Sequence, residues 1–186
     1  MVGKLLCLTL LAWGIPTETQ VPTDGVAAPI TYARSISVPL NGLLLFDKVN
    51  EAWTWTFGKE PGAKLLLSDR DNGLIEGSAR VNFRSKQLLL REESMGPIQY
   101  HVVLNVRAGE CRVTVSELVH TGNKTTTIGG VHMGLLTKSP DPIRRIRGAG
   151  GGNARRLYAE VKSVADQRIL AVLQAFEARL RASAEP

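Results

Sequence analysis

Residues 74–83 alternate apolar or small side chains with polar ones at every second position. This period is typical of an antiparallel strand that buries one face and exposes the other. An Arg-Asp-Asn-Gly turn sequence at residues 70–73 precedes this strand, and an apolar run within residues 64–69 precedes the turn. The pattern therefore predicts a β-hairpin over residues 64–83.

A second alternating pattern spans residues 100–115, on both sides of a polar turn at residues 107–110. Its inward positions pair symmetrically about that turn, which predicts a second hairpin. These positions are Tyr100, Val102, Leu104, Val106, Cys111, Val113 and Val115. The same register places His101 opposite Ser116 and His120 opposite Pro97, so we expect both histidines on the solvated face.

Two segments have the spacing of apolar residues that is typical of amphipathic helices. In the first, the apolar residues share one face of a helix that we expect to end near residues 58–61. They are Phe46, Val49, Trp53 and Phe57. Trp55 lies about 200° around this helix from Trp53, so it is either an exposed contact residue or part of a second packed layer. The second segment, residues 154–184, predicts a long helix.

Together these patterns predict an α+β fold, in which an antiparallel sheet of four to six strands packs against an N-terminal helix and a long C-terminal helix. A short strand over residues 36–40 contains Pro39, which predicts a place at the sheet edge. We expect four parts: a flexible leader (15–34), an α+β domain (35–137), an Arg-, Gly- and Pro-rich connection (138–153) and the amphipathic helix (154–184).

Residues 1–14 have the order of a secretory signal peptide, with one lysine, an apolar run and a small-x-small sequence at residues 12–14. The apolar run is about half as long as a membrane-spanning helix requires, so we expect no membrane span. A buried N-terminal helix is the alternative. Cleavage after residue 14 removes Cys7 and leaves Cys111, which we expect to be a small buried residue. The predicted location is the periplasm or cell surface.

The composition, 186 residues with 44% hydrophobic content, fits one globular domain. The net charge of +6 is concentrated near the C-terminus, because residues 138–186 contain 10 Lys and Arg against 5 Asp and Glu. Most of this excess of positive charge lies in residues 138–156, which include Arg144, Arg145 and Arg147. These arginines are candidates for contact with anionic lipid headgroups or an acidic partner, and a solvated loop is the other interpretation. No aromatic residues interleave with them, so no nucleic-acid partner is expected.

Residues 38–120 resemble the domain of unknown function family 4468. The resemblance depends on Phe-Asp-Lys at 46–48 with Trp53, Leu-Ser-Asp at 67–69 and the sequence at 71–79, and on residues 98–102 with 109–113. It implies an exported bacterial protein with a TATA-box-binding-protein-like fold. No catalytic or binding residue of that family carries over, and the connection and terminal helix lie outside the resemblance.

Motifs for catalysis are missing from the sequence. The three histidines and two cysteines lack the spacing of a zinc site, and neither a serine nucleophile elbow nor a Walker loop is present. We therefore predict no catalytic, cofactor-binding or metal-binding residues and no enzymatic activity. The predicted function is a binding or interaction module of the cell envelope, whose partner is an unknown protein or envelope component. The alternative is a carrier that holds an apolar ligand or lipid between the sheet and the C-terminal helix.

Overall fold

The computed structural model describes residues 27–87, 90–127, 129–143, 145–146 and 149–184. The predicted signal peptide and most of the predicted leader lie outside the described residues, as do Arg144 and Arg147.

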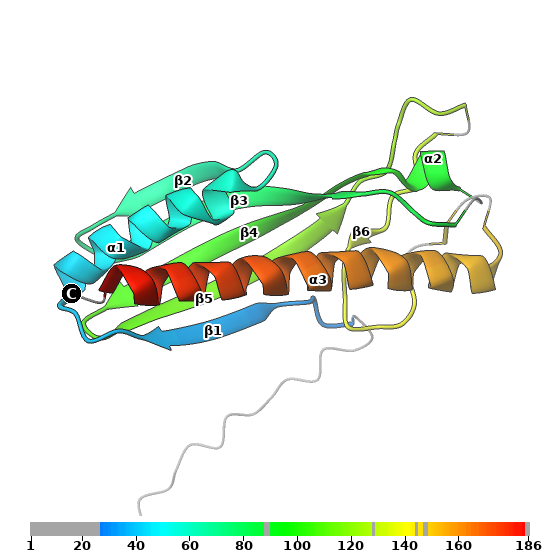
Figure 1. The fold of residues 1–186 in the computed structure, drawn as a ribbon. Coiled ribbons are helices and arrows are strands. Elements are labelled where there is room, and N and C mark those ends of the chain that lie inside the picture. The colour runs from blue at the N-terminus through cyan, green and yellow to red at the C-terminus, as the bar shows by residue number, and fades with distance from the viewer. Residues whose placement is uncertain (1–26, 88–89, 128, 144, 147–148, 185–186) are drawn as a thin grey trace, which may run out of the picture.

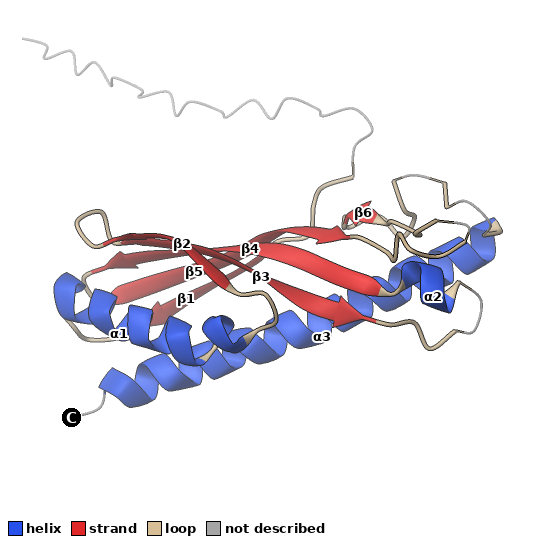
Figure 2. Ribbon diagram, turned by 90° about the horizontal axis from the view of Figure 1, so that it is seen from above, coloured by secondary structure: helices blue, strands red, loops and turns tan. Residues whose placement is uncertain are grey.

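The described chain forms one antiparallel sheet with two main helices on one of its faces (Figures 1 and 2). The strands are β1 (Tyr32–Ser37), β2 (Lys64–Asp69), β3 (Leu74–Phe83), β4 (Gly96–Arg107), β5 (Glu110–His120) and β6 (Gly134–Leu135). The helices are α1 (Gly42–Trp55), the 3₁₀ turn η1 (Phe57–Lys59), the short α2 (Arg91–Ser94) and α3 (Gly151–Ala184). The strand order is β1-β5-β4-β3-β2, and β6 pairs with β5. The predicted α+β fold is confirmed.

Both predicted hairpins are present, because local alternation and turn sequences specify them. β2 pairs with β3, and β4 pairs with β5 with His101 opposite Ser116, as expected. β1 lies at the sheet edge, although it begins at Tyr32, inside the stretch expected to be a leader, and ends before Pro39. α3 begins at Gly151, three residues earlier than expected.

The prediction for His120 is wrong, because β5 contains a bulge. Two steps along β4, from Gln99 to His101, oppose three steps along β5, from Val119 back to Ser116. Glu117 takes up the extra residue in the left-handed region, with φ of 56°. The bulge reverses the alternation beyond it, so Leu118 and His120 turn inward. His120 pairs with Ile98 instead of Pro97 and is 1% exposed.

The core fills the space between the sheet and the helices. Its buried side chains form one continuous apolar cluster. Leu45 of α1, Ile36 of β1, Leu104 of β4, Val113 of β5 and Phe176 of α3 are all fully buried. The packing is close at the α1 side as well, since a Cβ at Gly77 of β3 would overlap the Trp53 ring. We conclude that α1 and α3 lie directly on the sheet without an intervening ligand-sized layer at these positions.

The opposite face of the sheet is turned to solvent (Figure 2). It carries polar side chains, including Arg80 of β3, Gln99 and Asn105 of β4, and Arg112 of β5, all of them exposed. The fold is therefore two-layered, with one buried and one solvated face of the same sheet.

Candidate functional site

A basic surface lies where the connection after β6 meets the first half of α3. We call this surface the basic end and define it by five side chains: Lys138, Arg145, Arg155, Arg156 and Lys162. Two shallow hollows open there, and Arg155 lines both.

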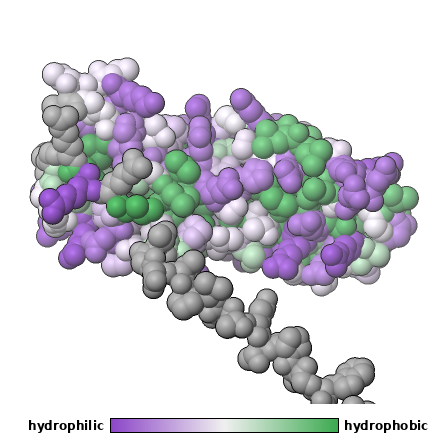
Figure 3. Space-filling model, turned by 180° about the vertical axis from the view of Figure 1, so that it is seen from behind, coloured by the Kyte–Doolittle hydropathy of each residue, from purple (hydrophilic) through white to green (hydrophobic). Residues whose placement is uncertain are grey.

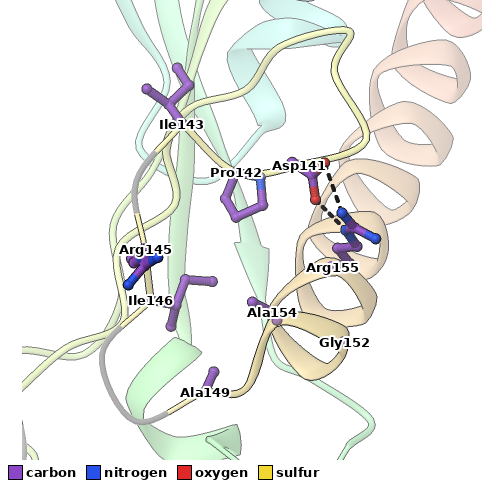
Figure 4. A pocket seen from close by; sticks show the side chains of 10 residues that line it. Asp141, Pro142, Ile143, Arg145, Ile146, Ala149, Gly152, Ala154 and Arg155 are labelled. Carbon is purple, nitrogen blue, oxygen red and sulfur yellow. Dashed lines mark hydrogen bonds and ion pairs between the residues drawn. The ribbon is translucent and has the colours of Figure 1, made fainter.

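The first hollow, the connection hollow, has a volume of about 630 Å³ (Figure 4). Ile146 and Ala149 of the connection and Ala154 of α3 supply its apolar lining, and Arg145 contributes a charge. Arg155 forms an ion pair with Asp141 across the rim, as the dashed lines in Figure 4 show. This ion pair links the connection to the first turns of α3.

The second hollow, the helix hollow, has a volume of about 620 Å³ and lies between residues 138–140 and α3. Its α3 lining recurs at spacings of three and four residues, which places it on one outward stripe of the helix. That lining consists of Arg155, Arg156, Ala159, Lys162, Ser163 and Asp166. Lys138 and Pro140 form the opposite side.

Two of the charged groups in the helix hollow are held by neighbouring residues. The Lys162 Nζ donates to the Ser139 carbonyl at 3.0 Å and lies 5.3 Å from the Tyr158 ring centroid. The Asp166 carboxylate accepts a hydrogen bond from the Tyr32 hydroxyl, and burial together with this carboxylate raises the pKa of Tyr32. Lys162 and Asp166 are thus fixed parts of the hollow.

Lys138 and Arg156, in contrast, are exposed and make no ion pair within the described residues. The hollow carries four cationic side chains and one carboxylate. Arg155 is already paired with Asp141. The positive charge available to an anion from solvent is therefore that of the other three cations.

Of the three arginines that the sequence singled out, only Arg145 is described. It is exposed and lines the connection hollow. Arg144 and Arg147 lie outside the described residues. The sequence shows the excess of positive charge in residues 138–156. It does not indicate that Lys162 belongs to the same surface, because Lys162 comes beside Lys138 only when α3 is folded.

The histidines lie apart from one another. His101 Nε2 is 3.9 Å from Glu76 on the open face of the sheet. His132 is exposed and its Nδ1 accepts the Gly122 N–H at 3.0 Å. Across the described ranges, no three His, Cys, Asp or Glu side chains gather in a group that could hold a metal ion.

His120 is instead part of the core. Its Nδ1 accepts the Met133 N–H at 3.3 Å, so Nε2 carries the proton and donates to the Ser94 carbonyl at 2.9 Å. Burial lowers the pKa of His120 to about 4, so the ring is neutral at physiological pH. It ties α2 and the segment before β6 to the end of β5.

Cys111 is a buried, unreactive thiol. Burial raises the pKa of Cys111 to about 12, which keeps its thiol protonated at neutral pH.

Trp55 is 56% exposed, so of the two interpretations that the sequence left open, the exposed residue is correct and the second packed layer is not. Its ring lies 4.8 Å from Lys59 Nζ and 5.8 Å from Arg179 Cζ, two cation–π contacts on the outer helix surface.

Strand β2 carries an apolar surface of its own. Leu65, Leu66 and Leu67 are 47%, 57% and 41% exposed. Figure 3 shows apolar surface at the end of the molecule that carries β2, with hydrophilic residues around it. This surface lies at the opposite end of the sheet from the basic end, so the two are separate features.

None of the described helices combines the length and the apolar composition that crossing a bilayer requires.

Comparison with solved structures identifies the type of fold, whereas sequence comparison finds no match. Neither a family model nor a curated protein matches the sequence. A solved TBP-like protein from Parabacteroides distasonis is similar in structure, with a TM-score of 0.50 and 13% identity, over 80% of this chain and 93% of that one. This chain has a TATA-box-binding-protein-like fold. The fold that the resemblance to family 4468 implies is thereby confirmed.

Two further solved structures are similar. A protein of the domain of unknown function family 4468 from Bacteroides ovatus has a TM-score of 0.46 and 18% identity, over 82% of this chain and 88% of that one. The Zhui aromatase/cyclase from Streptomyces has a TM-score of 0.37 and 10% identity, over 84% of this chain and 96% of that one. Neither likeness assigns an activity to this chain.

Proposed function

We propose that this protein is a non-enzymatic binding module of the bacterial cell envelope, and that its basic end contacts an anionic surface or partner there. One observation carries the proposal. Exposed lysine and arginine side chains gather around two hollows at one end of the molecule, outside the packed core. The function of such a fold resides in its surface, because the layer between sheet and helices is already filled by side chains.

The side chains with the chemistry for catalysis support a non-enzymatic role. The Cys111 thiol is fully buried and protonated, and His120 is engaged at both ring nitrogens. A nucleophile needs an adjacent base within hydrogen-bond distance and access to a substrate. Neither buried group offers that access.

The alternative, a carrier of an apolar ligand between the sheet and α3, has less support. A carrier needs a cavity lined by apolar side chains. Ile36, Leu104 and Phe176 would line such a cavity, yet all three are fully buried within one cluster. The connection hollow lies between the connection and the start of α3, and the helix hollow lies between residues 138–140 and α3, and no strand residue lines either of them.

An anionic lipid surface fits the basic end better than a neutral one. Each basic residue near a charged bilayer contributes about 1 kcal/mol of attraction. Ile143 is 53% exposed and lines the connection hollow together with Arg145. An exposed apolar side chain beside cations is the arrangement that interfacial segments use, with the apolar group inserted and the cations at the headgroups.

Export of the chain is part of the proposal and is supported by the sequence of residues 1–14 alone. We predict that the mature protein begins after residue 14. Intact-mass measurement of protein recovered from the producing cell tests this, and a mass that still includes residues 1–14 would contradict it.

Vesicle binding tests the function. We expect the mature chain to be retained on vesicles that contain phosphatidylglycerol and not on pure phosphatidylcholine. Replacing Arg145 of the basic end, together with its sequence neighbours Arg144 and Arg147, with glutamine should weaken retention about tenfold or more, since three basic residues are lost. A matched control replaces Lys59, Lys64 and Arg107 with glutamine. These three residues lie outside the basic end, so this control should change retention less than twofold. Equal retention on both kinds of vesicle, or unchanged retention of the arginine variant, would refute the proposal.

A further inference from the structure

We propose that the helix hollow is a binding site for a phosphate-bearing group, a step that rests on the proposed function and makes it specific. Its lining brings Lys138 from the connection and Arg155, Arg156 and Lys162 from α3 around one shallow space. Only Asp166 among the lining residues is acidic, and it is already engaged with Tyr32.

The arrangement of the cations favours a compact, multiply charged anion. Lys162 is fixed by the Ser139 carbonyl and by the Tyr158 ring, so it presents its charge without further ordering. Lys138 is anchored through its backbone, whose N–H donates to the Ala28 carbonyl at 2.9 Å, while its side chain stays exposed. Arginine and lysine together supply forked and point-charge donors, the combination that phosphate oxygens accept well.

The size and lining of the hollow favour an organic phosphate over a bare ion. Its volume of about 620 Å³ exceeds what one phosphate group occupies. Pro140 and Ala159 add apolar surface between the cations. A phosphate ester that carries a short carbon portion, such as a glycerophosphate headgroup, would contact both parts of this lining.

The neighbouring connection hollow offers a second contact when the phosphate group belongs to a membrane lipid. Arg155 lines both hollows, and exposed Ile143 lies in the connection hollow on its other side. A lipid whose headgroup occupies the helix hollow would leave the basic end against the bilayer, with Ile143 at the interface. A soluble phosphate ester would occupy the same hollow without that second contact.

The test compares two double variants of equal charge change. Lys138→Glu with Arg156→Glu alters the hollow, and Lys64→Glu with Arg107→Glu alters exposed cations elsewhere. All four side chains are exposed, so both variants should fold, which circular dichroism and the thermal midpoint verify. On phosphatidylglycerol vesicles we expect the hollow variant to bind at least tenfold more weakly than the wild type and the control variant to lose less than twofold. Equal losses in both variants would overturn the site while leaving a diffuse anionic contact in place.

A soluble probe separates the two sources of phosphate. Glycerol 3-phosphate is titrated against the wild type and the hollow variant, with sodium chloride at matched ionic strength as the blank, because simple charge attraction is screened by any salt. Saturable binding to the wild type that the hollow variant lacks supports the site, even if the wild type is not retained on vesicles. That combination would refute the membrane role alone. Binding that does not saturate, or that is unchanged in the hollow variant, overturns the phosphate site.

Discussion

At the scale of single residues, the most consequential side chain is His120, whose burial depends on the bulge at Glu117. Its ring contacts Phe83 edge to face at 5.4 Å between centroids and bridges two backbone segments. Both bridges require the neutral ring with its proton on Nε2. A proton on Nδ1 would face the Met133 N–H and break this hydrogen bond. Protonation of His120 at low pH therefore destabilises the folded state.

We predict that stability falls as the pH drops from about 6.5 towards 4. The pKa of His120 is lowered to about 4 in the folded chain, so the unfolded chain binds more protons across this window. The loss of unfolding free energy approaches about 3 kcal/mol at the lower end. Urea denaturation at a series of pH values measures it.

The His120→Gln variant isolates this contribution from carboxylates that also titrate in acid. The variant should be less stable at pH 7, and its stability should fall less between pH 6.5 and 4 than that of the wild type. Parallel pH profiles for the two proteins would show that His120 does not titrate as its burial requires.

At the scale of elements, the bulge in β5 determines which side chains at the C-terminal end of this strand, residues 118–120, enter the core. Glu117 adopts the left-handed conformation with φ of 56°, which disfavours side chains branched at Cβ. Leu118 and His120 are buried only because this one residue reverses the alternation.

We therefore expect Glu117→Val to be less stable than Glu117→Gly by about 1–2 kcal/mol or more, because that is the usual cost of holding a non-glycine residue in this conformation. Glu117→Gly should be tolerated, since glycine adopts this conformation freely. Thermal or urea unfolding of both variants tests the bulge, and a valine variant as stable as the glycine variant would contradict it.

The long helix α3 is held on the sheet by ion pairs along its flanks as well as by its apolar face. Glu60, with its side chain 2% exposed, accepts two hydrogen bonds from Arg168 at 2.9 and 2.6 Å. Arg34 of β1 donates to Glu177 at 2.7 Å, closer to the C-terminal end of α3. The Tyr100 hydroxyl, close to the first pair, has no hydrogen-bond partner among the described residues.

Removing Arg168 leaves the Glu60 carboxylate buried without its partner. We expect Arg168→Met to lower the unfolding free energy by about 1–3 kcal/mol, less than for a fully buried pair because the arginine is half exposed. Adding Glu60→Gln should recover part of the loss, since it removes the unpaired charge. A double-mutant cycle in urea measures both effects, and strictly additive losses would show that the pair is not coupled.

At the scale of the whole molecule, the sequence predicted what depends on local patterns. The hairpins follow from alternation and turn chemistry, and the two main helices follow from apolar spacing. The inward turn of His120 did not, because a bulge leaves no period of its own in the sequence. The early start of α3 at Gly151 did not either, since glycine normally disfavours helix.

The candidate site was predicted only in part, for a related reason. The excess of arginine and lysine in residues 138–156 is visible in the sequence. The helix hollow is not, because it needs Lys162, about two helical turns beyond Arg155, and Lys138 from across the connection. Charge is a property of composition, whereas a hollow is a property of how two segments lie against each other.

The measurement that tests this account most directly is hydrogen exchange of the whole protein with and without phosphatidylglycerol vesicles. The account predicts slower exchange in residues 138–146 and in the first turns of α3, with the open sheet face and β2 unchanged. Slower exchange confined to β2 or to the open face of the sheet, with the connection and α3 unaffected, would contradict it.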